Sequence, residues 1–362
     1  MKNILIAAGG TGGHISPGVA LAEILVEKKK DLDIDSIYIH SLTRNKDNSD
    51  LKEVPCKVIW HTTPQFSKNP FLFPLSFLIN FIKSSIEFKK VKIDVIIAMG
   101  GYSSLPSILF AILFRKKLFL CEQNRIIGKV LRSFIKFADK IAFSFEPINL
   151  NSIQNIHYKI LGNPIRKKIL PDIKDISNKL QITTKKEKIK VLVMGGSQGA
   201  RQINNMVLSL MNHSDISKNY QFRVLTGSNL YEETKAKSND SEAELISYSE
   251  DMKSHYEWAN LVIARSGAGV ISECSIFALP QILIPYPYAA DNHQSANAKY
   301  FEEKAGAWLI EQKDEDNTKL TKILLEILNN RNILVQKANL SLSCSKPSAS
   351  VDTIKYFFEN ER

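Results

Sequence analysis

The sequence predicts an α/β protein made of two domains, each built on a parallel β-sheet. Its 362 residues exceed what one hydrophobic core usually supports, which favours two domains of roughly 150 to 200 residues. A short apolar run, a glycine loop and a helical pattern follow one another at four places along the chain. Strands that alternate with helices in this way are typical of parallel sheets covered by helices on both faces.

The first of these units opens the chain. Residues 3–8 form a short apolar run without helical periodicity, which predicts a buried strand, and residues 9–14 (GGTGGH) predict the loop after it. Ser16 is expected to cap the following helix, with Pro17 at its first position. The apolar residues of that helix recur at the spacing of one helix face: Ala20, Leu21, Ile24 and Leu25.

The three later units are residues 94–101 (DVIIAMGG), 189–200 (IKVLVMGGSQGA) and 260–273 (NLVIARSGAGVISE). The first and third of the four units stand where two domains would each begin. Between them, residues 162–188 are polar, contain prolines and are rich in lysine, as expected of an interdomain linker followed by a surface segment. We therefore predict an N-terminal domain of residues 1–165, a C-terminal domain of residues 166–340, and a closing helix within residues 341–362 that packs back on the body.

Composition and charge narrow the class of partner. Hydrophobic residues make up 44% of the chain and charged residues 23%, which is typical of a globular protein. The formal net charge is +11, and residues 1–160 hold +9 of it, with 22 Lys+Arg against 13 Asp+Glu. A basic N-terminal half suits a partner rich in phosphate, whether anionic lipid, nucleic acid or an acidic substrate.

The four cysteines, at positions 56, 121, 274 and 344, lie far apart without C-x-x-C spacing or clustered histidines. This pattern predicts neither a zinc site nor a disulfide framework, so no metal is expected. The chain starts with only about five apolar residues before its glycines, fewer than the roughly 7 to 15 of a signal-peptide core. We therefore expect a protein of the reducing cytoplasm.

The glycine loops suggest a phosphate ligand. A loop that leaves the carboxyl end of a parallel strand and enters a helix presents backbone N–H groups and the positive end of the helix dipole. GGTGGH lacks the lysine of a P-loop, and Ile15 stands where a dinucleotide fingerprint has its third glycine, which weakens both the ATPase and the NAD interpretations. Each loop alone could be a tight turn, but four loops divided between two domains favour a cleft with phosphate-binding loops on both sides.

Two side chains beside these loops are candidates for chemistry. His14 closes the first loop, where an imidazole could act as a base, although a histidine in a loop is more often solvated or a cap. Glu273 falls on the helix after Arg265, Ser266 and Gly267, where a carboxylate could accept a pair of hydroxyls. A lone glutamate on a helix is usually a solvated surface residue.

Seven motifs together resemble those of the MurG glycosyltransferase family. They occur in the order of the family over about 290 residues: GGTGGH (9–14), MGGYSSLP (99–106), EQN (122–124), GNPIR (162–166), GGSQGA (195–200), RSGAGVISE (265–273) and DNHQSANA (291–298). The resemblance implies a fold of the GT-B type, in which two Rossmann-like domains face each other across a cleft. It also implies an acceptor domain first and a domain for UDP-N-acetylglucosamine (UDP-GlcNAc) second.

The resemblance further implies an activity and its site. The activity is inverting transfer of N-acetylglucosamine from UDP-GlcNAc to the C4 hydroxyl of a lipid-linked N-acetylmuramyl-pentapeptide, without a cofactor, in peptidoglycan synthesis. His14 matches the candidate general base and Glu273 the residue that holds the ribose hydroxyls. The other implied donor contacts are Thr11, Gly12, Gly13, Asn124, Arg166, Ser197, Ser249, Gly267, Ala268, Gly269, Val270, Ile271, Ser272 and Gln294. The chain departs from the family pattern at Cys121, where many members have histidine, and at Ser249, where an apolar residue commonly backs the uracil.

Two apolar runs bear on membrane binding. Residues 70–82 (PFLFPLSFLINFI) and 107–114 (SILFAILF) are both shorter than the roughly 20 residues of a membrane-spanning helix. The second run predicts a buried helix. The first has prolines, aromatic residues and flanking lysines, which favours an interfacial patch that contains Phe71, Phe73, Phe77 and Phe81. We therefore expect a peripheral protein at the cytoplasmic, anionic face of the inner membrane.

Two alternatives remain open at this point. A UDP-sugar enzyme of the same architecture, such as a UDP-GlcNAc 2-epimerase, would share the glycine loops but would not need the apolar patch. A non-enzymatic nucleotide-binding protein at the membrane would explain the charge but would leave His14 and Glu273 without a purpose. No nucleic-acid partner is expected, because the sequence contains no motif of that kind.

Overall fold

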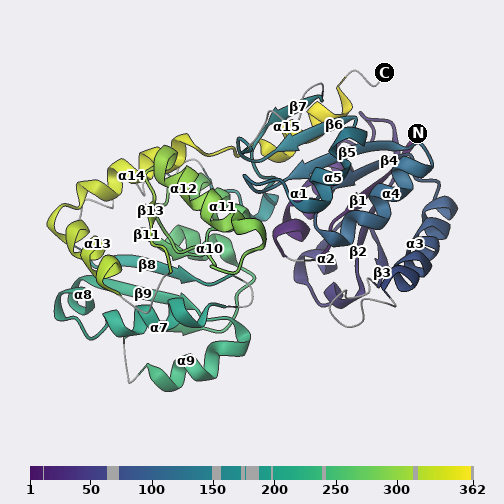
Figure 1. Ribbon diagram of the computed structural model, residues 1–362. Coiled ribbons are helices and arrows are strands. Elements are labelled where there is room, and N and C mark those ends of the chain that lie inside the picture. The colour runs from purple at the N-terminus through teal and green to yellow at the C-terminus, as the bar shows by residue number, and fades with distance from the viewer. Residues whose placement is uncertain are drawn as a thin grey trace. The chain divides into compact units, whose positions relative to one another are not determined.

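The computed structural model describes residues 1–10, 12–62, 73–148, 156–172, 176, 187–196, 199–238, 242–312 and 317–359. The chain divides into two compact units. Unit 1 consists of Met1–Lys167 and Ser348–Arg362, and unit 2 of Lys168–Pro347. Each unit is an α/β structure with its own parallel sheet, as the sequence predicts (Figure 1). The assignment of acceptor binding to residues 1–165 and donor binding to residues 166–340 stays a prediction.

Unit 1 contains a seven-stranded sheet in the order β3-β2-β1-β4-β5-β6-β7. All of its strand pairs are parallel. The strands are β1 (Lys2–Ala7), β2 (Ile34–Leu42), β3 (Lys57–His61), β4 (Val95–Ala98), β5 (Lys117–Glu122), β6 (Lys140–Phe143) and β7 (Tyr158–Ile160). The chain therefore builds one side of the sheet outward from β1 and then returns to place β4 on the other side of β1.

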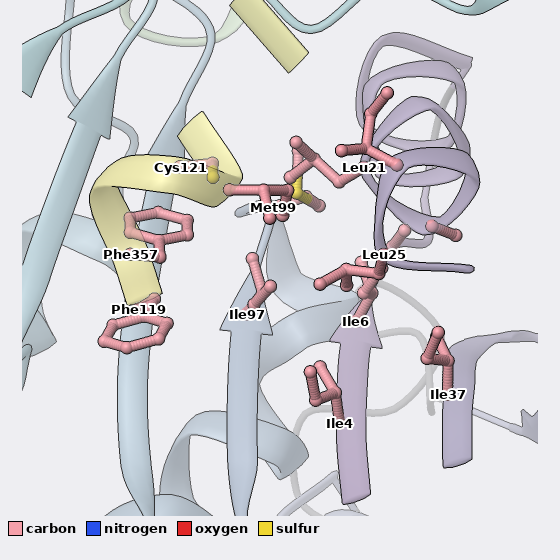
Figure 2. Close-up of a cluster of buried hydrophobic side chains, with 14 of the residues drawn as sticks. Ile4, Ile6, Leu21, Leu25, Ile37, Ile97, Met99, Phe119, Cys121 and Phe357 are labelled. Carbon is pink, nitrogen blue, oxygen red and sulfur yellow. The ribbon is translucent and has the colours of Figure 1, made fainter. Parts of the chain in front are cut away.

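Helices cover both faces of this sheet. They are α1 (Gly12–Glu27), α2 (Ser49–Glu53), α3 (Phe73–Lys90), α4 (Leu105–Leu113), α5 (Lys129–Phe134) and α15 (Ala349–Phe358). Because successive side chains of a strand point to opposite faces, Ile4 and Ile6 join one core cluster while Leu5 joins the other. Figure 2 shows the first cluster, where side chains of β1, β4 and β5 meet α1 and the C-terminal helix α15. The rings of Phe119 and Phe357 stack there at 4.6 Å.

The helix α1 begins at Gly12, four residues before the predicted cap, so the expectation that Ser16 caps it is wrong. Glycine has a low helix propensity, which is why the sequence favoured a later start. Within the helix, α1 packs closely on the end of β1. A β-carbon at Gly18 would lie 2.5 Å from the β-carbon of Ala8. Only a glycine allows α1 to approach the end of β1 this closely.

Unit 2 contains a six-stranded sheet in the order β10-β9-β8-β11-β12-β13, again with parallel pairs. Its strands are β8 (Ile189–Met194), β9 (Tyr220–Leu225), β10 (Glu244–Ile246), β11 (Leu261–Ala264), β12 (Gln281–Leu283) and β13 (Trp308–Leu309). Its helices are α7 (Arg201–Leu210), α8 (Ser214–Asn219), α9 (Tyr231–Lys237), α10 (Met252–Trp258), α11 (Ala268–Ile276), α12 (His293–Ala305), α13 (Thr318–Asn329) and α14 (Asn332–Ser343).

In unit 2 too, successive side chains of a strand pack into cores on opposite faces of the sheet. Val191 and Val193 of β8 pack into a cluster with side chains of α7 and α13. Leu192 lies between them and is also fully buried, so the sheet is covered on its second face too. Buried strands of this kind read as continuous apolar runs, which is why the sequence identified them without an alternating pattern.

Each sheet has one point where the direction of strand addition reverses. It lies between β1 and β4 in unit 1, and between β8 and β11 in unit 2. In open parallel sheets, the crevice outside the carboxyl ends of the strands at such a point is where ligands bind. The four glycine loops of the sequence follow these four strands.

Candidate functional site

In unit 1, the imidazole of His14 lies against the backbone of the loop after β4. His14 is half-buried in the first turn of α1. Gly101 has φ +70°, and a β-carbon there would lie 3.2 Å from His14 Cε1. A β-carbon at Gly100, where φ is +92°, would lie 3.5 Å from His14 Nε2. The two glycines therefore permit both the left-handed backbone and the close seat of the imidazole at the switch point.

The loop after β5 carries Asn124, and a buried carboxylate holds it. Glu122 Oε1 accepts hydrogen bonds from Asn124 N at 2.9 Å and from Asn124 Nδ2 at 3.3 Å. Glu122 Oε2 accepts one from Gly128 N at 2.8 Å. Burial raises the pKa of the Glu122 carboxyl to about 7, although these hydrogen bonds act to lower it. The sequence assigned no role to Glu122 beyond its place in a motif, because burial is not visible in one glutamate.

The structure places Arg166 in an ion cluster within unit 1. Its guanidinium, 4% exposed, donates to Glu23 of α1 and to Asp50 and Glu53 of α2. Burial alone would lower the pKa of Arg166, but the three carboxylates raise it above its usual value. This packing gives Arg166 a structural role, and the donor contact implied by the resemblance stays a prediction.

Two of the other implied contacts in unit 1 are well placed for a ligand. Gly12 and Gly13 are exposed at the start of α1, beside His14. Thr11 lies outside the described residues. The backbone N–H groups in the first turn of a helix have no partner within the helix, so this turn can donate hydrogen bonds to an anion.

In unit 2, the implied contacts from Gly267 to Glu273 form the start of α11. Gly267 is the N-cap residue, and no side chain in the described residues caps this helix. Ala268 and Ile271 face the core, whereas the remaining positions are half-buried: Gly269, Val270, Ser272 and Glu273. The uncapped N–H groups at the switch point between β8 and β11 are suited to a phosphate.

A hydrogen-bond network joins α11 to α12. Ser266 Oγ donates to Gln294 O at 2.8 Å, and Asn297 Nδ2 donates to Ser266 O at 3.2 Å. The side-chain oxygen of Gln294 accepts from Tyr286 N at 2.9 Å. Gln294 therefore lies directly beside the loop that precedes α11, and its contact with the donor stays a prediction. Ser197 of the loop after β8 lies outside the described residues.

Arg265 stabilises the same region. Its side chain is 7% exposed, and Nη1 donates to Ile284 O, Pro285 O and Gln312 Oε1. Burial lowers the pKa of Arg265 to about 10, so the guanidinium remains charged at neutral pH. It fixes the loop after β12, which carries Tyr286.

The last implied contact, Ser249, lies in the loop between β10 and α10. It is half-buried, and its Oγ accepts from Asp251 N at 3.2 Å. Asp251 in turn caps α10 by accepting from Ser254 N. Ser249 therefore orders the start of α10, and its contact with a uracil stays a prediction.

Glu273 accepts a hydrogen bond from a tyrosine of the helix that precedes it in the chain. Tyr256 of α10 donates from its hydroxyl to Glu273 Oε2 at 2.7 Å. The sequence did not single out Tyr256, because the contact depends on how α10 and α11 pack.

The predicted membrane patch falls mostly on α3. Phe71 and the side chain of Phe73 lie outside the described residues, and Phe77 and Phe81 are half-buried. The large apolar side chains that α3 exposes are instead Leu75, Leu78, Ile79, Ile82 and Ile86, at 45 to 59%. No helix among the described residues is long and apolar enough to cross a bilayer.

Comparison with known proteins agrees with this fold and these motifs. The profile of the glycosyltransferase family 28 N-terminal domain matches residues 4–143, and that of the C-terminal domain matches residues 190–352. The crystal structure of Acinetobacter baumannii MurG has a TM-score of 0.78 at 22% identity and 99% coverage of both chains. A UDP-GlcNAc 2-epimerase from Neisseria meningitidis, bound to UDP-GlcNAc, has a TM-score of 0.66 at 12% identity. These likenesses establish a fold of the GT-B type.

Two curated proteins have a higher sequence identity to the chain than these solved structures. A protein of Leptospira interrogans is 57% identical over 99% of both chains, and one of Francisella tularensis is 33% identical over 99% of both. Both are named UDP-N-acetylglucosamine–N-acetylmuramyl-(pentapeptide) pyrophosphoryl-undecaprenol N-acetylglucosamine transferase. With the two domain profiles matched in order and identity at this level over the full length, the chain belongs to glycosyltransferase family 28.

Proposed function

We propose that the chain transfers N-acetylglucosamine from UDP-GlcNAc to the C4 hydroxyl of a lipid-linked N-acetylmuramyl-pentapeptide, a step of peptidoglycan synthesis. The observation that carries the proposal is the 57% identity, over 99% of both chains, to a transferase named for this reaction. The alternative of a 2-epimerase rests on a likeness of 12% identity, which speaks to the fold alone.

In this proposal, unit 2 binds the donor UDP-GlcNAc. The uncapped N-terminus of α11 hydrogen-bonds the diphosphate, and Glu273, further along the same helix, accepts hydrogen bonds from the ribose hydroxyls. The arrangement supports this assignment because β8 and β11 are neighbours in the sheet and their carboxyl ends lie at its switch point. One preorganised donor to the charge that develops on the leaving diphosphate contributes about 3 kcal/mol.

Proton removal falls to His14 of unit 1. As the acceptor oxygen bonds to the anomeric carbon, the bond from that carbon to the diphosphate breaks and UDP leaves. His14 takes the proton of the acceptor hydroxyl, and a single displacement of this kind inverts the anomeric carbon. The packing of the His14 imidazole against Gly100 and Gly101 supports its role as general base, because it holds the ring at the switch point between β1 and β4.

Membrane binding falls to α3, at the cytoplasmic face of the membrane. Its exposed residues Leu75, Leu78, Ile79, Ile82 and Ile86, here called the α3 strip, follow the spacing of one helix face. The cations on the same helix are Lys83, Lys89 and Lys90, against the single acid Glu87. An apolar strip bordered by cations suits a helix that lies in the interface of an anionic bilayer. A surface of this kind brings the enzyme to an acceptor carried on a lipid.

The direct test offers UDP-GlcNAc labelled in the sugar to lipid-linked N-acetylmuramyl-pentapeptide. Label should move into the lipid phase with release of one UDP per sugar transferred. Incubation without the acceptor is the control, and it also tests the epimerase alternative. Conversion of UDP-GlcNAc to its 2-epimer, with no label in lipid, would replace the transferase by the epimerase.

A further inference from the structure

Two neighbouring helices of unit 2 meet through one buried phenol. Tyr256 of α10 is 1% exposed, and its hydroxyl donates to Glu273 Oε2 of α11 at 2.7 Å. We propose that Tyr256 is the positioning residue that sets the orientation of the Glu273 carboxylate toward the two hydroxyls of the donor ribose. The inference rests on the proposed function, in which Glu273 accepts hydrogen bonds from that ribose.

The ring of Tyr256 is itself held in place. It packs on Phe277 with ring centroids 5.2 Å apart and an interplanar angle of 36°. Phe277 is the C-cap residue of α11 and follows Glu273 by four residues, so the two side chains lie on the same side of the helix end. Tyr256 therefore contacts α11 at two points, with its ring on Phe277 and its hydroxyl on Glu273, and the phenol oxygen is fixed relative to the helix.

The hydroxyl of Tyr256 keeps its proton at neutral pH. Burial raises the pKa of Tyr256 well above its usual value, and the neighbouring Glu273 raises it further. The phenol thus stays protonated and donates to Glu273 Oε2. The 2.7 Å distance between the phenol oxygen and Glu273 Oε2 is typical of a well-formed O–H···O hydrogen bond.

Fixing the carboxylate matters for the recognition of a diol. Two vicinal hydroxyls bind a carboxylate well only when its plane is turned toward both of them. A glutamate side chain that is free to rotate loses conformational entropy when it binds, whereas one already held by a phenol loses less. The hydroxyl of Tyr256 should therefore contribute to affinity only when the ligand has ribose hydroxyls to offer.

The test compares two ligands and three variants by calorimetry: UDP and 2′,3′-dideoxy-UDP with Tyr256→Phe, Glu273→Ala and Tyr220→Phe. Tyr256→Phe keeps the ring on Phe277 and removes the hydroxyl alone. We expect it to weaken UDP binding about three- to tenfold, to leave binding of the dideoxy ligand within about twofold, and to raise the donor KM with little change in kcat.

Tyr220→Phe is the matched control. Tyr220 is also 1% exposed in unit 2, and its hydroxyl donates to Leu324 O at 2.6 Å. The Tyr220→Phe variant loses a buried phenol hydrogen bond of the same kind, but from the contact between β9 and α13. The ratio of its affinities for the two ligands should therefore equal that of the wild type.

Each outcome separates the inference from the proposed function. Equal losses for both ligands in Tyr256→Phe would mean a merely structural contact and would overturn the positioning role. That role would also fail if Glu273→Ala abolished the preference for UDP while Tyr256→Phe retained it in full. If Glu273→Ala leaves the preference unchanged, Glu273 does not bind the ribose, and that part of the proposed function fails together with the inference.

Discussion

The imidazole rings of His40 and His61 stack with their centroids 3.7 Å apart and an interplanar angle of 22°. The two side chains, 0% and 7% exposed, lie near the carboxyl ends of β2 and β3. His40 Nδ1 is 2.8 Å from Ser107 Oγ of α4. Burial lowers the pKa of His61 to about 4 and lowers that of His40 well below its usual value, to which the neighbouring ring adds. Both rings are therefore neutral at pH 7.

This pair predicts that unit 1 loses stability in mild acid. In the unfolded chain both histidines take up protons near pH 6.5, whereas in the folded unit they do not until the pH is far lower. The unfolded state therefore binds more protons below pH 6.5, and the free energy of unfolding falls as the pH decreases. Between pH 7.5 and pH 5.5 we expect the pair to lower the free energy of unfolding by about 1 kcal/mol or more. Glu122, whose pKa is raised to about 7, acts in the opposite direction, because its folded form takes up a proton in this range. Urea denaturation of the wild type and of a variant without the pair, at each pH, separates the two effects.

A variant isolates the contribution of the pair. His61→Phe keeps an aromatic ring on His40 and removes one group that titrates, so the loss between the two pH values should become smaller. His157→Gln, which removes an exposed imidazole from the same unit, should keep the wild-type loss. Identical pH dependence in wild type and His61→Phe would rule out the buried pair as the source.

Replacing His14 by alanine should lower turnover by about 10²- to 10⁴-fold, the usual contribution of a general base. The affinity for UDP should change by less than about twofold, because the proposed role concerns the acceptor hydroxyl. Steady-state transfer rates and UDP calorimetry measure the two quantities separately. Normal turnover in His14→Ala would remove the imidazole from the mechanism.

A variant of Arg166 can separate its structural role in the ion cluster from the donor contact that the resemblance implies. Arg166→Leu leaves Glu23, Asp50 and Glu53 without their shared cation, so the free energy of unfolding should fall by about 3 kcal/mol. The neighbouring Lys167 pairs with Glu27, and both side chains are about half exposed. Lys167→Ala should therefore cost less than about 1 kcal/mol. Calorimetry with UDP then decides the second role: unchanged affinity in a folded Arg166→Leu protein would leave the ion cluster as its only function.

The α3 strip predicts binding to anionic vesicles that depends on salt. Serine at Leu78, Ile79 and Ile82 together should weaken binding at least tenfold, because each exposed aliphatic side chain loses apolar area that would enter the lipid. Sedimentation with vesicles of phosphatidylglycerol and phosphatidylcholine, at low and high salt, measures the effect. Vesicles of phosphatidylcholine alone measure the binding that does not depend on anionic lipid, so the difference between the two vesicle types gives the contribution of charge.

The matched control for the α3 strip carries serine at Ile160 and Val351. These residues are exposed at 42% and 38% in the same unit, but on β7 and α15. Binding should stay at the wild-type level in this variant. An equal loss of vesicle binding in both variants would indicate nonspecific hydrophobic adsorption rather than a membrane-binding surface on α3.

Local sequence determined much of the architecture. The apolar runs that end in glycines identified β1, β4, β8 and β11 and the loops after them, because a buried parallel strand and a tight strand-to-helix turn each have a composition of their own. Two parallel sheets followed from the alternation of strands and helices. The candidate positions on α11, α12 and α1 followed from motif and order along the chain.

Only the tertiary structure decided the contacts between segments far apart in sequence. The close approach of Gly18 to Ala8 joins α1 to the end of β1, and the partners of Arg166 come from α1 and α2, more than 100 residues earlier in the chain. The stacked histidines, the buried carboxylate of Glu122 and the phenol of Tyr256 likewise owe their properties to burial and to neighbours on other elements. The composition of a segment reports its own backbone preference, whereas desolvation and hydrogen-bond partners arise only when the sheets and helices pack.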